Sequence, residues 1–160
     1  MTECIELDGV VYKFSRLTLK HEDEWRDWLR GRIKNEAYRD SEGWDAATRA
    51  DYLARVSQKV AGGQAAFLSE YGMQTLSEPD GACKVLEMAS RVNHPAPHVP
   101  QDVLRRLFSE QPERVEEVII AVLPIPPRAR AALEKKLLES RASAQALATT
   151  SSDGPTDGPI

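Results

Sequence analysis

The chain has few cysteines, no long apolar run and no surplus of basic residues, and each absence excludes a class of protein. The only cysteines among its 160 residues are Cys4 and Cys83. They are too far apart to form a short metal-binding or redox pair, so we expect reduced thiols. No apolar stretch approaches the roughly 20 residues of a membrane helix. The N-terminus lacks a basic region followed by an apolar run, so no secretory signal is predicted.

The charge balance is mildly acidic. Lys and Arg total 21, Asp and Glu total 25, and the net charge is −4. A protein that coats DNA normally shows a basic surplus, so nucleic acid is not the expected partner. Membrane affinity is not expected either, and we expect a protein of the cytoplasm.

Motifs that carry catalysis are also missing from the sequence. There is no nucleophile elbow, and Gly62-Gly63 lacks the Lys-Ser/Thr that a phosphate-binding loop requires. His94 and His98 are separated by prolines, so they do not form a ligand pair on one helical turn. The sequence therefore predicts no enzyme, no cofactor and no metal.

What the chain does have is helical periodicity, most clearly between residues 80 and 123. Apolar residues recur there at spacings of three and four, which predicts a helix, a stiff proline-rich connector over residues 93–100 and two shorter helices. Because none of these can bury its apolar face alone, we expect this segment to form the core. The predicted core positions are Val85, Leu86, Met88, Ala89, Val92, Val103, Leu104, Leu107, Phe108, Val115, Val118, Ile119 and Val122.

A β-hairpin is predicted over residues 4–14. Asp8-Gly9 favours a type I′ turn, which pairs Leu7 with Val10 and Ile5 with Tyr12. A lone hairpin is marginally stable in water. It must therefore lie on the helices or pair with a strand of a partner.

A helix beginning at Thr18 follows the hairpin. Trp25, Trp28, Leu29 and Ile33 recur on one face, and we favour core packing for the two tryptophans over a partner surface.

The middle of the chain is predicted to alternate helices and breaks. Asp45 is expected to cap a helix that ends near Ala61, and Gly62-Gly63 to break it. A short helix is expected at residues 66–68, and Ser77 or Asp80 is expected to cap the helix after it.

The C-terminal part is expected to be a basic helix and a tail. The helix runs from Pro126 or Pro127 to about Leu147, and residues 148–160 are rich in Ser, Thr, Asp, Gly and Pro, which predicts disorder. The predicted fold is thus a mainly α protein, a small helical bundle with an N-terminal β-hairpin, in one domain over residues 1–147. The apolar face of the last helix is expected at Ala129, Leu133, Leu137, Ala144 and Leu147, and its basic residues are Arg128, Arg130, Lys135, Lys136 and Arg141.

A succession of helices is also typical of DNA-binding proteins of the helix-turn-helix type. The helix over residues 102–110, with Arg105 and Arg106, is the best candidate for reading a groove. The proline-rich connectors and the acidic net charge argue against it, so a nucleic-acid-binding adaptor is kept as the second alternative.

Several short motifs together resemble a known family. They are the hairpin Leu7-Asp-Gly-Val-Val-Tyr-Lys-Phe14, the junction Arg16-Leu-Thr-Leu-Lys20, the connector Val92-Asn-His-Pro95 and the segment Asp102-Val-Leu104. This arrangement resembles the tail assembly chaperones and small tail-morphogenesis proteins of tailed bacteriophages.

The resemblance implies a protein of the host cytoplasm that binds other phage proteins, such as the tape-measure protein, and performs no catalysis. A chaperone of this kind would cover apolar helices of its client in helical grooves. The candidate partner-binding residues are Trp25, Trp28, Phe67, Phe108, Arg128 and Arg130.

The chain departs from the expected family pattern in its hydrophilic middle and in the basic helix after Pro127. The alternative is therefore a structural virion subunit of the head, neck or tail that forms homo-oligomers and pairs with its neighbours by strand addition.

Overall fold

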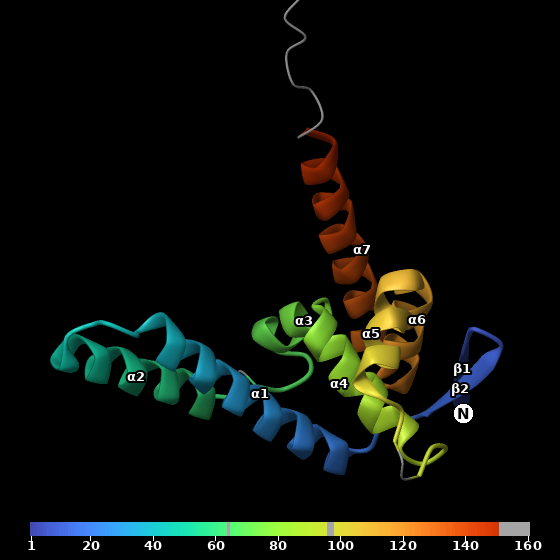
Figure 1. Cartoon of the computed structure of the whole chain (residues 1–160), viewed down its shortest axis with the longest axis horizontal. Helices are drawn as coiled ribbons and strands as arrows, with labels where there is room; N and C mark the ends of the chain where they lie inside the picture. Colours follow the sequence, from blue (N-terminus) through green and yellow to red (C-terminus); the bar gives the residue numbers. More distant parts are fainter. Residues whose placement is uncertain (64, 96–97, 151–160) are drawn as a thin grey trace, which may run out of the picture. The chain divides into compact units, whose positions relative to one another are not determined.

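The computed structural model describes residues 1–63, 65–95 and 98–150, apart from the side chains of 137, 140, 141 and 144–150. Over these residues the fold is mainly helical, with seven helices after a two-stranded antiparallel hairpin, as predicted (Figure 1). The elements are β1 (Thr2–Leu7), β2 (Val10–Ser15), α1 (Leu19–Asp40), α2 (Ala46–Ala61), α3 (Glu70–Leu76), α4 (Pro79–Ser90), α5 (Gln101–Glu110), α6 (Pro112–Val122) and α7 (Pro127–Thr150). The chain forms two compact units, Met1–Pro124 and the part from Ile125 onward.

The hairpin has the predicted turn and register. Asp8 and Gly9 both have positive φ, 54° and 77°, as a type I′ turn requires. Leu7 pairs with Val10 and Ile5 with Tyr12. Of the two predicted ways to stabilise the hairpin, the structure uses the first, because β2 packs on α4 and β1 on α6.

Side chains from α6 and the residue before it cap the outer edge of β1. Gln111 Nε2 donates to the carbonyl of Glu6 at 2.6 Å, and Arg114 Nη2 donates to the carbonyl of Cys4 at 3.2 Å. These carbonyls face away from β2, where they would otherwise invite another strand.

The start of the connector caps the outer edge of β2 in the same way. The Lys13 amide donates to Nε2 of His94 at 3.0 Å, and Asn93 Nδ2 donates to the Lys13 carbonyl at 3.3 Å. After the hairpin, the Leu17 amide donates to the Val122 carbonyl at 2.7 Å. Residues from the second half of the chain thus hold the first element in place.

The core forms around α4, α5 and α6, as the periodicity predicts. The interior residues from these helices are Val85, Leu86, Met88, Ala89, Leu104, Leu107, Val115, Val118, Ile119 and Val122. Val92 was predicted to join them, but its side chain is 73% exposed. The reason is that α4 ends at Ser90 and the following residues turn away, with the amides of Asn93 and His94 both bonded to the Ser90 carbonyl.

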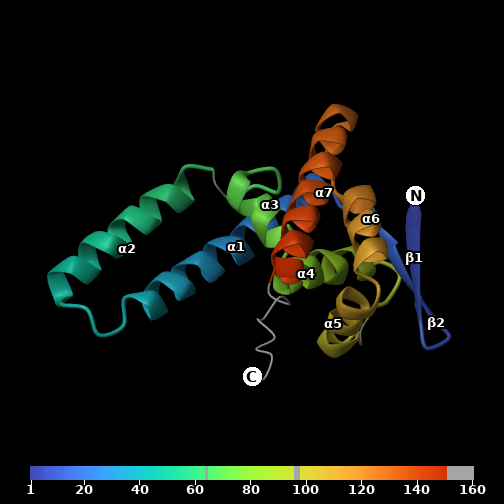
Figure 2. The same ribbon diagram turned by 90° about the horizontal axis from the view of Figure 1, so that it is seen from above.

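Helices α1 and α2 form an antiparallel pair. Trp25 and Leu29 are fully buried, which confirms the core interpretation for Trp25, while Trp28 and Ile33 are half-buried. Asp45 caps α2 as predicted, because its Oδ1 accepts the Thr48 amide at 3.0 Å. In Figures 1 and 2 the C-terminal half of α1 and all of α2 extend away from α4, α5 and α6.

The short helix predicted at residues 66–68 is wrong. These residues form turns, and helix begins only at Glu70. Ser69 Oγ accepts the Gly72 amide at 2.9 Å and so starts α3. A Cβ on Gly72 would lie 2.0 Å from the Ala66 carbonyl oxygen, because the turn segment passes directly over the helix.

The predicted cap of α4 is also wrong. The N-cap is Glu78, followed by Pro79 in the first helical position, and neither Ser77 nor Asp80 caps the helix. The Ser77 hydroxyl instead donates to the Met73 carbonyl at 3.1 Å, and Asp80 pairs with Arg105.

Helix α7 begins at Pro127 as predicted and continues to Thr150, three residues beyond the predicted end. The predicted tail beyond residue 150, and the predicted side-chain positions of Leu137, Arg141, Ala144 and Leu147, lie outside the described residues. Among the described helices, none is long and apolar enough to cross a membrane.

Candidate protein-binding groove

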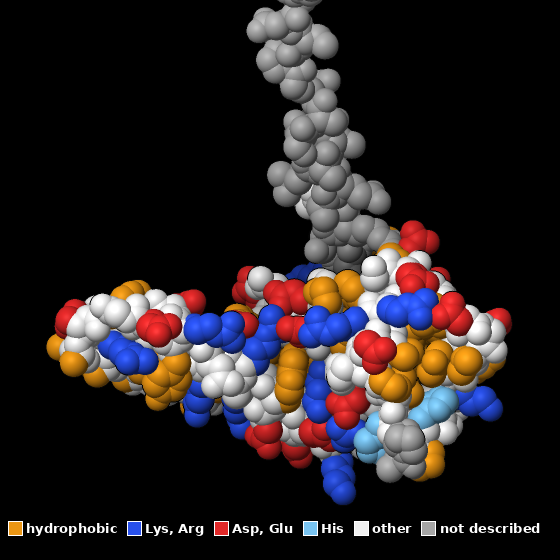
Figure 3. Space-filling view, viewed as in Figure 1, with side chains coloured by type: hydrophobic (Ala, Val, Ile, Leu, Met, Phe, Trp, Pro, Cys, Tyr) orange, Lys and Arg blue, Asp and Glu red, His pale blue; other side chains and the backbone are white. Residues whose placement is uncertain are grey.

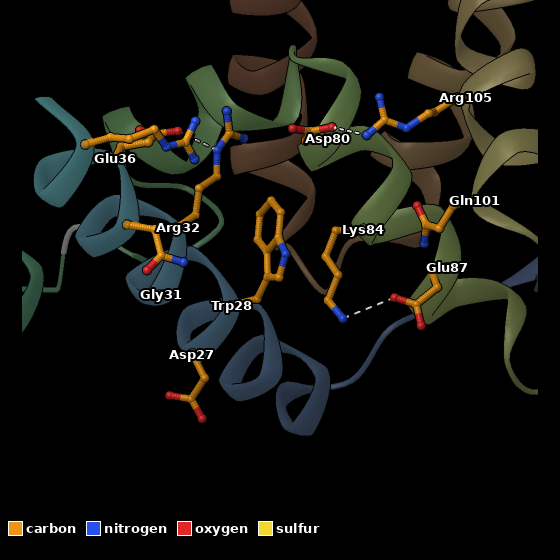
Figure 4. A pocket seen from close by; sticks show the side chains of 12 residues that line it. Asp27, Trp28, Gly31, Arg32, Glu36, Asp80, Lys84, Glu87, Gln101 and Arg105 are labelled. Atoms are coloured by element: carbon orange, nitrogen blue, oxygen red, sulfur yellow. Dashed lines mark hydrogen bonds and ion pairs between the residues drawn. The ribbon is translucent and has the colours of Figure 1, made fainter.

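An open groove of about 870 Å³ runs between α1 and the pair α4 and α5 (Figure 4). One wall is a single face of α1, because its residues recur at helical spacing. The other wall comes from the first turns of α4 and α5 and from the middle of α4. The lining residues are Asp27, Trp28, Gly31, Arg32, Asn35, Glu36, Arg39, Asp80, Lys84, Glu87, Gln101 and Arg105. We call this feature the α1–α4 groove.

Trp28 and Gly31 shape the α1 wall. Figure 4 shows the Trp28 ring between the side chains of Arg32 and Lys84, and the Arg32 guanidinium lies 5.8 Å from the ring centroid. One turn on, Gly31 has no heavy atom within 4 Å of where a Cβ would be. The groove therefore offers one apolar ring beside a stretch of bare backbone.

Arg32 connects α1 to the start of α4. Its Nε donates to Glu36 at 2.9 Å, and its Nη2 donates to Glu78. Burial works to lower the pKa of Arg32, but the bonds to these two carboxylates outweigh it and hold the pKa above its usual value. The guanidinium stays charged and fixed at one end of the groove.

Lys84 of α4 and Arg91, which directly follows α4, hold Glu24 of α1. Arg91 binds Glu24 with two bonds of 2.8 Å, one to each carboxylate oxygen, and Lys84 Nζ lies 2.8 Å from Glu24 Oε1. Both cations also bind Glu87, at 2.6 Å and 3.1 Å. Two carboxylates and two cations thus join α1 to α4 beside the groove.

This network lowers the pKa of Glu24 to about 2. Partial burial alone would raise that pKa, but the hydrogen bonds from Arg91 and Lys84 and their positive charges lower it further than burial raises it. Glu24 therefore stays ionised at every pH at which the protein is expected to work.

The structure separates the predicted partner-binding residues. Trp25 and Phe67 are buried, with ring centroids 5.0 Å apart, so they belong to the core. Trp28 packs on Trp25 at 5.1 Å and reaches the groove. Phe108 is half-buried on α5 and lies outside the groove, and Arg128 and Arg130 lie in the first turn of α7.

Most groove residues were missed by the sequence analysis. Arg32, Asp80, Lys84 and Arg105 are charged residues at helical spacing, and a solvated helix face has the same pattern. Gly31 was the one available signal, because a glycine inside a helix costs about 1 kcal/mol relative to alanine.

The arginines proposed for nucleic-acid recognition are paired with carboxylates. Arg105 lies 2.8 Å from Asp80, and Arg106 lies 2.8 Å from Asp8 and 3.0 Å from Glu110. The charges of these arginines are balanced within the chain, which lowers their attraction for phosphate.

His94 and His98 form hydrogen bonds within the chain. His94 accepts the Lys13 amide, and His98 Nδ1 lies 3.2 Å from the His94 carbonyl oxygen. Both cysteines are free, and burial raises the pKa of the Cys83 thiol. Within the described ranges, His, Cys, Asp and Glu side chains form no group of three or more that could hold a metal ion.

Comparisons with known proteins found no matching family model, no matching curated protein and no matching solved structure.

Proposed function

We propose that this chain is a non-enzymatic protein of tailed-phage tail assembly, which holds or positions other tail proteins through the α1–α4 groove. The resemblance of the hairpin and the Asn93-His94-Pro95 connector to tail assembly chaperones supports the biological setting. The single observation that supports the binding mode is the groove itself, an open groove of about 870 Å³ between one face of α1 and the pair α4 and α5.

The shape and chemistry of the groove suit a helix of the partner. Helices bind in grooves between other helices when their side chains fit the spaces on the walls. The bare backbone at Gly31 would allow close approach, and Trp28 would contact an apolar residue of the bound helix. The lining side chains include four acidic and four basic groups, so the bound helix is expected to carry charges of both signs around its apolar residue.

A groove-blocking variant tests the proposal. Gly31→Trp places a large ring in open space at the wall, so the fold should be kept while a bound helix is excluded. Each variant is co-expressed with the expected client, the tape-measure protein encoded by the same phage. The amount of client that stays soluble and co-purifies with the variant is measured. We expect the wild type to retain the client and Gly31→Trp to lose at least about tenfold in affinity, roughly 1.4 kcal/mol.

Two control variants separate blocking from other effects. Gly31→Ala adds a single methyl group at the same position and should keep client binding. Lys20→Trp adds an exposed tryptophan elsewhere on α1 and should also keep it. If Gly31→Trp folds and binds the client as well as these controls do, the groove is not the binding site.

A further inference from the structure

Helix α2 is amphipathic, yet only one of its residues is buried. Tyr52, Val56 and Val60 recur on one face, and of these only Val60 is fully covered. The helix packs on α1, and α1 and α2 together form a two-helix hairpin. We call residues 30–61 the arm. Two antiparallel helices are half of a four-helix bundle, and alone they leave apolar side chains partly exposed.

A cleft of about 250 Å³ lies between the two helices of the arm, and Tyr71 of α3 also lines it. Ile33 and Ala37 of α1 and Tyr52, Val56 and Val60 of α2 form its apolar part. At the free end, the ring of Trp44 lies 5.1 Å from that of Tyr52 and remains 45% exposed. By helical periodicity, the cleft residues Ile33, Ala37 and Asp40 lie on a different face of α1 from the groove residues Trp28 and Arg32, and Glu36 between them lines both.

The charges of the arm are divided along its length. Residues 30–35 and 54–61, where the arm joins the rest of its unit, contain five basic residues and no acidic one. Residues 36–53, toward the free end, contain five acidic residues and two basic ones. Figure 3 shows basic side chains where the arm joins the unit and hydrophobic side chains along one rim.

Two residues of the cleft repeat this division. Asp40 lines it toward the free end, and Lys59 lines it toward the joined end. Within the part of the chain that the structure describes, neither side chain forms an ion pair shorter than 4.0 Å. Both charges are available to a second molecule.

We propose that two copies of the chain pair arm against arm, antiparallel, about a two-fold axis, and so complete a four-helix bundle. A two-fold axis perpendicular to the arm places the free end of each arm against the joined end of the other. The acidic end then meets the basic end twice, and Asp40 of each copy approaches Lys59 of the other. A parallel arrangement would instead oppose like charges. This inference concerns a different face of α1 from the centre of the groove and does not depend on the proposed function.

The size of the arm predicts a weak dimer. A 16-residue helix is about 24 Å long, and two packed helices are about 20 Å wide, so each copy contributes on the order of 500 Å² of flat contact. Stable interfaces bury roughly 800 Å² per partner, and weaker, transient ones bury less. Association should therefore depend on protein concentration and should weaken as salt screens the opposed charges.

A charge-swap experiment tests the proposal on the full-length chain. Light scattering after size-exclusion chromatography, over a hundredfold range of concentration, should show a monomer passing to a dimer. Lys59→Glu places an acidic side chain at the basic, joined end of the arm. Asp40→Lys places a basic side chain at the acidic, free end. Each variant alone should dimerise at least about tenfold more weakly. An equimolar mixture of the two should form a heterodimer with affinity close to that of the wild type.

Asp23→Lys, a reversal at an exposed site of α1 outside the arm, serves as the control and should leave dimerisation unchanged. Circular dichroism confirms that each variant is folded. A wild type that stays monomeric throughout, a ring of higher order, or single variants that dimerise like the wild type would each overturn the proposal. So would a mixture that fails to restore the dimer. The weakening of each single variant specifies the antiparallel arrangement, because in a parallel pair residue 40 would face residue 40 and residue 59 would face residue 59, and a reversal would leave like charges opposed as before.

Discussion

Two tryptophans three residues apart on α1 have different roles, and truncating each should show it. Trp25 is fully buried between Trp28 and Phe67, whereas Trp28 is only half-buried and lines the groove. Trp25→Ala should lower the free energy of unfolding by about 3–5 kcal/mol, because it leaves a large cavity in the core. Trp28→Ala should cost about 1 kcal/mol, since less of the ring leaves a buried environment. Urea denaturation measures both, and equal losses would contradict the different roles.

At the same scale, Glu24 should make the free energy of unfolding depend on pH. Its pKa is about 2 in the folded protein, compared with 4.5 for a free glutamate. A carboxyl whose pKa is lowered by folding stabilises the protein above its unfolded pKa, and this contribution is lost as pH falls from about 4.5 to 2. Glu24→Gln removes the charge, so it should cost about 1–2 kcal/mol at pH 7 after allowance for solvent screening.

The pH dependence distinguishes this ion pair from simple packing. The difference in unfolding free energy between wild type and Glu24→Gln should shrink steadily below pH 4.5 and nearly vanish near pH 2. Asp27→Asn, whose carboxylate is 80% exposed and only 3.6 Å from Arg30, is the matched control and should change stability little at any pH. A Glu24→Gln penalty that is constant from pH 7 to pH 2.5 would show that the charge is not responsible.

At the scale of elements, alanine substitution at three helical glycines should destabilise the protein at two positions and stabilise it at the third. A Cβ on Gly72 would lie 2.0 Å from the Ala66 carbonyl oxygen, and one on Gly81 would lie 2.0 Å from the Thr75 carbonyl oxygen. Both contacts are with backbone, so either substitution must shift a helix, and we expect a loss of about 3 kcal/mol or more. Gly31→Ala meets open space and should stabilise by up to about 1 kcal/mol. Thermal melts of the three variants measure this, and stabilisation at Gly72 or Gly81 would contradict the described packing of α3 and α4.

The capped edge of β2 gives a second prediction at this scale. His94→Ala removes the acceptor of the Lys13 amide, so hydrogen exchange at that amide should quicken by up to about tenfold, and the fold should lose about 1 kcal/mol. Val92→Ala changes an exposed neighbour in the same segment and should leave the exchange rate unchanged. An unchanged rate in His94→Ala would mean that His94 does not hold the edge in solution.

What the sequence predicts well is local. Asp8-Gly9 determines the turn and the register, Asp45 and Gly62 mark the ends of α2, and prolines mark the starts of α6 and α7. The helix wrongly predicted at residues 66–68 has a tertiary cause. These residues form the turn whose backbone crosses α3 at Gly72, and a similar crossing occurs on α4 at Gly81. The groove exists because certain helix faces remain uncovered in the folded protein. Charged residues at helical spacing do not indicate which faces these are.

At the scale of the whole molecule, α1 presents two different surfaces. The α1–α4 groove lies on one face and the cleft of the arm on another, with Glu36 at the border of both. If both proposals hold, dimerisation leaves the grooves open, and a complex of two chains with two client helices should form. Light scattering of the purified complex gives this stoichiometry. A complex of one chain with one client that excludes the dimer would show that the two surfaces compete.

The bonds that hold the hairpin also determine when it can become fixed during synthesis. The hairpin leaves the ribosome before the residues that hold it, because its edges are bound by residues 93–114 and Leu17 is bound by Val122, which is 105 positions later. At about 5 to 20 residues per second, the ribosome needs roughly 5 to 20 s to make that stretch. The hairpin is therefore secured only after most of its unit has been translated. Until residues 93–114 emerge, the nascent chain presents open strand edges to whatever is beside it.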